Sequence, residues 1–403
     1  MLRLALRNVF RHRLRTALTL AAIVAGVAGL ILSGGFVEDS LLQLREATIH
    51  SQIGHLQIYR AGYYEHGQQS PFKFLIDKPA DVLREVAKLP EVDDAMARLA
   101  FSGVLNNGKT DLPIVGVGLE ADKENRLGSF IAITAGRALR AGDASQILLG
   151  EGVARSSGLR PGDSATLLVN TAGGALNTLD FEVAGIFRSF SKDYDARTVR
   201  IPLAAARELL DVDAANAIVV ALKDTDATAA AAASLRRTLD PRVYEVKTWD
   251  ELADFYGKTA ALYRRQFAVL QAIILVAVLL SVANSINMST FDRIGEFGTL
   301  RALGNRSGTI LRLVLSENLL LGLAGALAGA AIGVLLARVI SAIGIPMPPP
   351  PNSSAGYVAV IRVVPWVVAA SALVGFVATV AASVWPAMRI ARLPVVDALR
   401  QNQ

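Results

Sequence analysis

The sequence predicts an α-helical membrane protein with four transmembrane helices and a large α+β extracytoplasmic domain, which has a split βαβ core and a small all-β insertion. Three observations predict this class. Hydrophobic residues make up 52% of the 403 residues and charged residues only 19%, which is too apolar for a typical soluble protein. The apolar residues gather in four runs, each long enough to span a bilayer as a helix. A stretch of ordinary globular composition lies between the first run and the second.

Residues 1–37 are predicted to form a basic amphipathic helix followed by the first transmembrane helix. Five arginines are interspersed with apolar residues in the first 15 positions, a pattern typical of a helix that lies on an anionic leaflet. Thr16–Val37 is apolar and about 20 residues long, which is enough to span. A cleaved signal peptide has the same order of basic and apolar residues. The length of the run and the later spans favour an uncleaved anchor.

Residues 38–265 are predicted to form the extracytoplasmic α+β domain. A βαβ-β pattern is followed by a βαβ pattern, which is compatible with a split α+β sandwich. Asn107 and Gly108 form the turn between two predicted strands, 96–105 and 112–119. Residues 128–202 are rich in turn-forming glycine, proline and aspartate and carry short alternating strands, which predicts the all-β insertion.

Residues 266–403 are predicted to hold the other three transmembrane helices and a tail. The helices are expected at residues 266–290, 313–340 and 363–384. The connections are a polar loop at 291–312 and an outer loop at 341–362, whose proline run favours an extended, stiff conformation. Gly325, Gly329 and Gly333 recur every four residues, which favours close helix packing within the subunit over a dimer seam.

The distribution of arginine predicts the orientation of the chain. The N-terminal segment, the polar loop and the tail after Trp385 are all basic. An even number of spans separates each pair of these segments, so all three can lie in the cytoplasm, as the positive-inside rule requires. The topology is then N-in and C-in, with the large domain and the proline-rich loop outside. Arg264 and Arg265 lie at the outer end of the second span, against this trend.

The polar loop contains a short predicted helix with an apolar stripe. Four apolar residues recur every third position, along one face: Ile294, Phe297, Leu300 and Leu303. Three charged residues flank them: Arg293, Glu296 and Arg301. Gly298 thins the helix, and Gly304 stands where a C-terminal cap is expected. On these residues alone, a charged loop that sets topology is favoured over a plug for another protein's groove.

Three stretches resemble the FtsX-like permease family, the membrane subunits of MacB-type and LolC/LolE-type ABC transporters. Arg293-x-x-Glu296-x-Gly298-x-Leu300-Arg301-Ala302-Leu303-Gly304 is similar to the signature loop of that family. The N-terminal LRNVFRHRLRTALTLAAIVAGVA is similar to its basic leading helix and first span, and WPAMRIARLPVVDALR at Trp385–Arg400 is similar to its closing pattern. The segment ILLGEGVARSSGLRPGDSATLLV resembles, more loosely, the insertion subdomain of the MacB-type periplasmic domain.

The resemblance implies a permease dimer in the bacterial inner membrane, bound to two copies of a separate ABC ATPase that holds the ATP and Mg²⁺. The chain itself would bind no cofactor. The Ile294–Leu303 helix would sit in the ATPase cleft and pass its motion outward by mechanotransmission. The substrate would be amphipathic (a lipoprotein, a lipid or a hydrophobic compound) and would be moved or extracted on the periplasmic side. A homodimer or a heterodimer with a related permease, and a periplasmic adaptor or acceptor, stay open.

Two other classes of function compete with a transporter. An FtsX-like regulator relays ATPase motion to an extracytoplasmic partner such as a cell-wall hydrolase and transports nothing. A domain of about 230 residues is larger than a docking module requires, which weighs against this class. A membrane-anchored enzyme or sensor without an ATPase is disfavoured by the loop match and by the lack of a catalytic constellation.

The sequence favours a non-enzymatic chain. It contains no Gly-x-x-x-x-Gly-Lys-[Ser/Thr] motif, so it is not expected to hydrolyse ATP as P-loop proteins do, and it contains no cysteine. His50, His55 and His66 have irregular spacing and no acidic partner placed for zinc, so no metal site is predicted. The net charge of +6 comes from arginines beside the apolar runs, which indicates membrane orientation rather than nucleic-acid binding.

Four polar residues in the predicted spans are candidates for coupling or a substrate path. Glu317 and Asn318 lie near the cytoplasmic end of the third span, where a carboxylate should face protein or water. A contact that couples the loop helix to the bundle and a carboxylate that stays hydrated at the interface are equally compatible with Glu317. Asn284 and Asn287 share one face of the second span, where hydrogen bonding between helices is favoured over a path.

Overall fold

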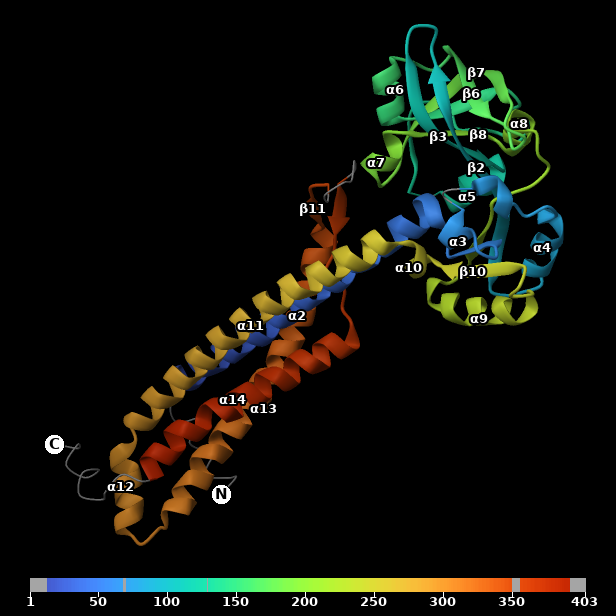
Figure 1. Ribbon diagram of the computed structural model, residues 1–403. Helices are drawn as coiled ribbons and strands as arrows, with labels where there is room; N and C mark the ends of the chain where they lie inside the picture. The colour runs from blue at the N-terminus through green and yellow to red at the C-terminus, as the bar shows by residue number, and fades with distance from the viewer. Residues whose placement is uncertain (1–12, 68–69, 129, 350–355, 392–403) are drawn as a thin grey trace. The chain divides into compact units, whose positions relative to one another are not determined.

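The computed structural model describes residues 13–67, 70–128, 130–349 and 356–391 (Figure 1). The chain divides into two compact units. The helical unit comprises residues 1–42, 260–347 and 358–403, and the α+β unit comprises residues 43–259 and 348–357. The predicted divisions at 37/38 and 265/266 fall a few residues away, because the first two long helices continue past their apolar segments. The predicted leading helix and the end of the tail lie outside the described residues.

Among the described residues, four long helices are apolar enough over 18 residues to cross a membrane. Their bounds are α2 Arg13–Thr48, α11 Asp254–Phe291, α13 Ser307–Ile343 and α14 Pro365–Ala391. Helices α2, α11 and α13 each contain one predicted span and extend beyond it at both ends, whereas α14 begins two residues after the start of the span predicted at 363–384 and extends past its end. The differences arise because hydropathy marks only the part that suits a lipid environment, whereas backbone hydrogen bonds carry the helix on into polar sequence.

The glycines of α13 lie directly against α2. A Cβ atom added to Gly325 would lie 2.8 Å from Ile23, one at Gly329 would lie 2.8 Å from Val27, and one at Gly333 would lie 3.0 Å from Ile31. Only glycine allows the two backbones to approach this closely. The prediction that these glycines pack a helix within the subunit is confirmed.

The helical core extends from α2 to the other helices. Ile23, Val27 and Ile31 pack with Val278, Val282 and Ile286 of α11. Gly26 of α2 lies against Val278, and Gly375 of α14 lies against Val27. Helix α2 therefore contacts α11, α13 and α14, and is the central helix of this unit.

Two shorter pieces complete the helical unit. Helix α12, Ile294–Ala302, occupies the loop between α11 and α13. Strands β11, Ile345–Met347, and β12, Tyr357–Ala359, form a two-stranded sheet in the connection between α13 and α14. The expected stiff outer loop is thus anchored at its base by strand pairing. Pro350 and Pro351 lie outside the described residues.

The α+β unit is built on ten strands in the order β10-β1-β9-β2-β3-β8-β5-β7-β4, with β6 paired to β2 and β7 (Figure 1). The first five strands are β1 Leu56–Arg60, β2 Val92–Asn106, β3 Asp111–Leu119, β4 Ala132–Gly136 and β5 Gln146–Gly150. The others are β6 Ser164–Asn170, β7 Leu176–Arg188, β8 Thr198–Pro202, β9 Ala217–Leu222 and β10 Tyr244–Thr248.

Short helices connect and cover these strands. The α-helices are α3 Tyr63–His66, α4 Pro79–Val86, α5 Ala121–Leu127, α6 Glu151–Ser157, α7 Lys192–Asp195, α8 Leu203–Leu210, α9 Thr228–Thr238 and α10 Trp249–Leu252. A π-helix, η1, spans Ile49–Ile53, and 3-10 turns span η2 Pro71–Phe74 and η3 Thr225–Ala227.

The long strand β2 belongs to two hydrophobic cores. Its first half pairs with β9 and packs with α4 and α9 in the split βαβ core. Its second half pairs with β3 and β6 in the other core. The prediction of an all-β insertion at 128–202 is wrong in one respect, because this segment contains α6 and α7. Helix α6 has seven residues, too few for helical periodicity to be recognised among turn signals.

A buried charge cluster joins β2, α5 and β8. Arg98 Nη2 donates to Glu124 Oε1 at 2.6 Å, and its Nε donates to Oε2 at 3.1 Å. Arg200 Nη1 lies 3.5 Å from the same Oε1. The Glu124 and Arg200 side chains are only 4% and 5% exposed. One buried carboxylate therefore holds three separate elements together through two arginines.

We predict that Gly329→Leu will destabilise the helical unit by about 1–3 kcal/mol, the usual cost of overpacking, because the new side chain must displace Val27 of α2. Thermal unfolding of the detergent-purified chain measures the effect. Ala328→Leu, at the exposed neighbouring position, is the control and should leave the melting temperature near that of the wild type. Equal melting temperatures for the two variants would contradict the assigned α2–α13 contact.

Candidate functional site

The loop between α11 and α13 is fixed to the bundle by a buried ion pair. Arg293, the residue before α12, has a side chain that is 8% exposed. Its Nη1 donates to Glu317 Oε2 at 2.6 Å, its Nη2 donates to Glu317 Oε1 at 3.2 Å, and its Nε donates to Glu296 Oε2 at 3.1 Å. This two-point contact with Glu317 is the strong, directional form of an arginine–carboxylate pair.

The ion pair decides between the two interpretations of Glu317. Its side chain is 10% exposed and faces Arg293, so it is not a hydrated carboxylate at the interface. It is instead the contact that joins the loop to α13. Since breaking a buried ion pair is strongly destabilising, a shift of α12 that keeps the pair must be accommodated by α13.

Two members of the predicted apolar stripe face inward. Ile294 and Phe297 are 5% and 3% exposed, and Phe297 packs against Ile310 and Val314 of α13 and Ala387 of α14. These two residues of the stripe are therefore not available to a partner that docks on the outside of the loop. Periodicity identified the common face correctly, but that face covers the end of the bundle.

The exposed part of the loop lies at the C-terminal end of α12. Leu300 is half-buried, whereas Leu303 is 76% exposed. The neighbouring residues that also face outward are Glu296, Thr299, Ala302, Gly304, Asn305 and Arg306. Thr299, Asn305 and Arg306 are not among the predicted site residues, because they lie between or just beyond the matched positions of the family pattern.

The turn that presents Leu303 is well defined by its backbone. Gly304 has a φ of +91°, the left-handed conformation that glycine adopts without strain, so its predicted position just after the helix is confirmed. The backbone N–H and the Nδ2 of Asn305 both donate to the carbonyl of Leu300, at 3.1 and 3.0 Å. An asparagine after a helix-ending glycine is a signal that could have indicated this cap from the sequence.

The other predicted residues have separate surroundings. Gly298 is buried, and Arg301 is half-buried on α12. Asn318 is 6% exposed and donates to the carbonyl of Val314 in its own helix at 2.9 Å. Asn284 is exposed on α11 and Asn287 is half-buried. Their neighbour Ser285 is the polar residue of α11 whose hydroxyl bonds to another helix, at Thr19 of α2.

A second polar cluster lies in the α+β unit around η1. His55 is 1% exposed; its Nδ1 accepts from the backbone N–H of Leu222 at 3.1 Å, and its Nε2 lies 3.1 Å from Thr225 Oγ1. The Thr225 hydroxyl lies 3.3 Å from both Glu46 carboxylate oxygens. His50 Nε2 lies 3.4 Å from Glu46 Oε2. These two histidines thus fix the segment between α2 and β1.

Burial, together with the neighbouring His50, lowers the pKa of His55 to about 4 from 6.5. Between these values the unfolded chain binds more protons than the folded one, so stability present above pH 6.5 is lost as the pH falls towards 4.

We predict that protonation of His55 lowers the free energy of unfolding by up to about 3 kcal/mol over this pH range. Melting temperature against pH measures it in the full chain. His55→Asn should flatten the profile, whereas His66→Asn, at an exposed histidine, should not. An unchanged slope in His55→Asn would contradict the assignment.

Family models match both parts of the chain. The MacB-like periplasmic core domain matches residues 16–238, and the FtsX-like permease C-terminal domain matches residues 268–395. The second match contains α12, the Arg293–Glu317 pair and the exposed turn at Leu303. Four membrane-length helices together with a periplasmic-type domain fit a protein of the inner membrane.

Known proteins with similar sequences agree with these matches. The lipoprotein-releasing system transmembrane protein LolE of Haemophilus influenzae is 24% identical over 62% of this chain and 61% of its own length. The macrolide export ATP-binding/permease protein MacB of Rhodopseudomonas palustris is 24% identical over 86% of this chain and 53% of its own length. This chain thus spans less than two thirds of either relative.

A solved structure of the periplasmic region of MacB from Actinobacillus actinomycetemcomitans superposes with a TM-score of 0.38 at 15% identity, covering 50% of this chain and 92% of that one. The matched periplasmic core and permease domains together account for both units of the fold. This protein therefore belongs to the FtsX-like permease family, as an ABC transporter permease of the MacB and LolE type.

Proposed function

We propose that this permease carries motion from a separate ABC ATPase into the membrane by mechanotransmission. The observation that supports the proposal is the buried Arg293–Glu317 pair, which joins the exposed loop to α13. A partner that pushes on α12 would push on a helix 37 residues long, and helices transmit force along their axes because their backbone hydrogen bonds run that way.

The ATPase is proposed to dock on the exposed turn around Leu303. This surface combines one large apolar side chain with the charged residues Glu296 and Arg306. Family members work with ABC ATPases, and we infer two copies here, one for each permease of a homodimer or heterodimer. ATP and Mg²⁺ would be bound by the ATPase, and this chain would bind no cofactor and perform no catalysis itself.

The proposed orientation places the N-terminus, α12 and the C-terminus in the cytoplasm, with the α+β unit in the periplasm. Basic residues near all three cytoplasmic segments support it. The substrate is proposed to be an amphipath that is moved or extracted on the periplasmic side. The names of LolE and MacB point to a lipoprotein and to a hydrophobic small molecule, two substrates that share an apolar portion.

We predict that Leu303→Asp will abolish co-purification of the ATPase, because it places a charge at the centre of the docking surface. The measurement is a mild-detergent pull-down of the tagged chain with mass spectrometry of the bound proteins. Leu176→Asp is the matched control, since Leu176 is a 66% exposed leucine of the α+β unit and should keep the ATPase. Retention of the ATPase by Leu303→Asp at wild-type stability would contradict the docking site.

The same pull-down separates transport from regulation. Recovery of the ATPase with a lipoprotein, lipid or other amphipath supports transport. Recovery of the ATPase with a cell-wall hydrolase and no amphipathic cargo would favour the FtsX-like regulator.

We predict that Arg293→Gln and Glu317→Gln will each destabilise the chain by about 3–5 kcal/mol, since each breaks a buried, two-point ion pair by removing one of its charges. The double variant should recover part of that loss, because neither charge then remains. Thermal unfolding of the wild type and the three variants gives the coupling free energy. Additive effects of the two substitutions would contradict a direct energetic link between α12 and α13.

A further inference from the structure

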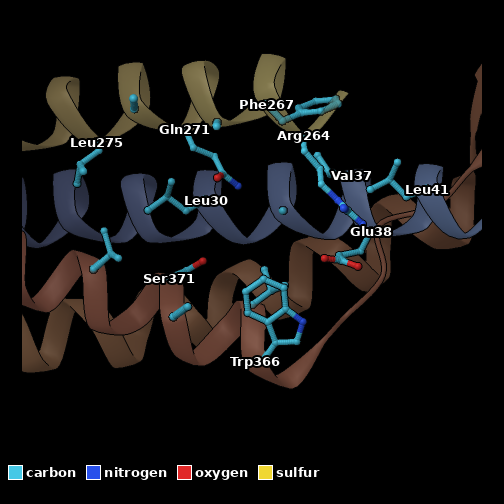
Figure 2. Close-up of a pocket in the computed structure, with 16 residues that line it drawn as sticks. Leu30, Val37, Glu38, Leu41, Arg264, Phe267, Gln271, Leu275, Trp366 and Ser371 are labelled. Carbon is cyan, nitrogen blue, oxygen red and sulfur yellow. The ribbon is translucent and has the colours of Figure 1, made fainter. Parts of the chain in front are cut away.

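A cavity of about 600 Å³ opens between the outer halves of α2, α11 and α14 (Figure 2). All of its lining residues belong to the helical unit. Its volume falls within the range of about 300–1,000 Å³ that is usual for small-ligand sites. The Arg293–Glu317 pair and α12 do not line it, so the coupling site does not account for it.

The lining of the cavity changes from charged to apolar along its length, in the same order on all three helices. At one end lie Glu38 of α2, Arg264 of α11 and Trp366 of α14. Gln271 and Ser371 follow, and Figure 2 shows both among the side chains around the cavity. The opposite end is formed by Leu30, Leu275 and Val374. The charged end lies nearest the periplasm in the proposed orientation, on which this inference rests.

The polar side chains that line the cavity do not hold the helices together. Within the described part of the chain, the side chains of Glu38, Arg264, Gln271 and Ser371 make no hydrogen bond or ion pair with another residue. Polar groups at membrane depth are costly unless they meet protein, water or a ligand. Arg264 also contradicts the positive-inside trend. Gln271 and Ser371 lie deeper than the charged end, and together with Glu38 and Arg264 they indicate an occupant that has its own polar atoms.

The dimensions match one leaflet of a bilayer. Arg264 and Leu275 are 11 positions apart on α11, which corresponds to about 16 Å of helix. Half of the hydrocarbon core of a bilayer is about 15 Å thick. Trp366 is 63% exposed at the charged end, and tryptophan is enriched at the membrane–water interface. An outer-leaflet lipid would thus have its head at Glu38 and Arg264 and its tail at Leu275.

We propose that this cavity binds a zwitterionic glycerophospholipid whose head carries a phosphate and a primary amine. Arg264 would donate to the phosphate and Glu38 would accept from the ammonium, because the mouth offers one charge of each sign. Gln271 and Ser371 lie at the level of the ester groups, and the apolar end holds an acyl chain. This site deepens the proposed function by naming an amphipath that the bundle holds.

The test is a lipid titration of the delipidated full chain, followed by native mass spectrometry. Phosphatidylethanolamine and phosphatidylglycerol with identical acyl chains are the probes. The wild type is expected to prefer phosphatidylethanolamine by about tenfold, since only that head offers an ammonium donor to Glu38. Equal binding of the two lipids, or a preference for phosphatidylglycerol, would overturn the zwitterionic assignment.

Three substitutions locate the binding. Arg264→Gln and Glu38→Gln should each weaken phosphatidylethanolamine binding by about tenfold. Ala272→Trp, which fills the cavity from α11, should weaken binding of both lipids. Arg265→Gln is the matched control, since Arg265 is the exposed neighbour that does not line the cavity. Wild-type binding by Ala272→Trp, or equal effects of Arg264→Gln and Arg265→Gln, would overturn the site.

The assay needs no ATPase, so its outcome is separate from that of the pull-down. Retention of the ATPase by Leu303→Asp, together with an intact lipid preference, would overturn only the proposed docking site. Loss of the ATPase by Leu303→Asp, with no lipid preference in the wild type, would overturn only the cavity assignment.

Discussion

Close backbone contact between α2 and α13 is the constraint on which the helical unit depends. Water does not drive these helices together in a bilayer, so association relies on packing, and packing relies on small residues. Gly325, Gly329 and Gly333 bring α13 onto α2. Because α2 also contacts α11 and α14, its position sets the positions of the other three long helices.

The coupling loop is built on this bundle. Helix α12 covers the end of α13 and α14 with Phe297, while Arg293 reaches Glu317 within α13. The apolar contact gives α12 its location, and the ion pair gives it a fixed register, because a two-point arginine–carboxylate contact tolerates little displacement. Because α12 is fixed in this way, the turn at Gly304 holds Leu303 outward, where a partner can bind it.

The same bundle also explains the outer cavity. Gly26 lets α11 approach α2 at Val278. Nearer the charged end, Gly34 faces Gln271 and Val367, and the three helices leave a space of about 600 Å³. A single helix, α2, therefore contributes both the tight packing and the wall of a site that suits an amphipath. In the proposed mechanism, motion of α13 would reach the proposed lipid through α2, which contacts α13 and lines the cavity.

The sequence by itself determined the features that depend on local chemistry. Four apolar runs correspond to four long helices of the described residues, Asn107 and Gly108 lie in the turn between β2 and β3 as predicted, and Gly304 follows α12 where expected. Tertiary structure decided which faces are covered. Periodicity places Ile294, Phe297, Leu300 and Leu303 on one face but cannot say that α13 and α14 bury the first two. The contact of Glu317 with Arg293 and the placement of Glu38 and Arg264 at one end of the same cavity depend on segments far apart in the sequence. Local patterns fix which residues share a surface, whereas the contacts of that surface are set by the packing of the whole bundle.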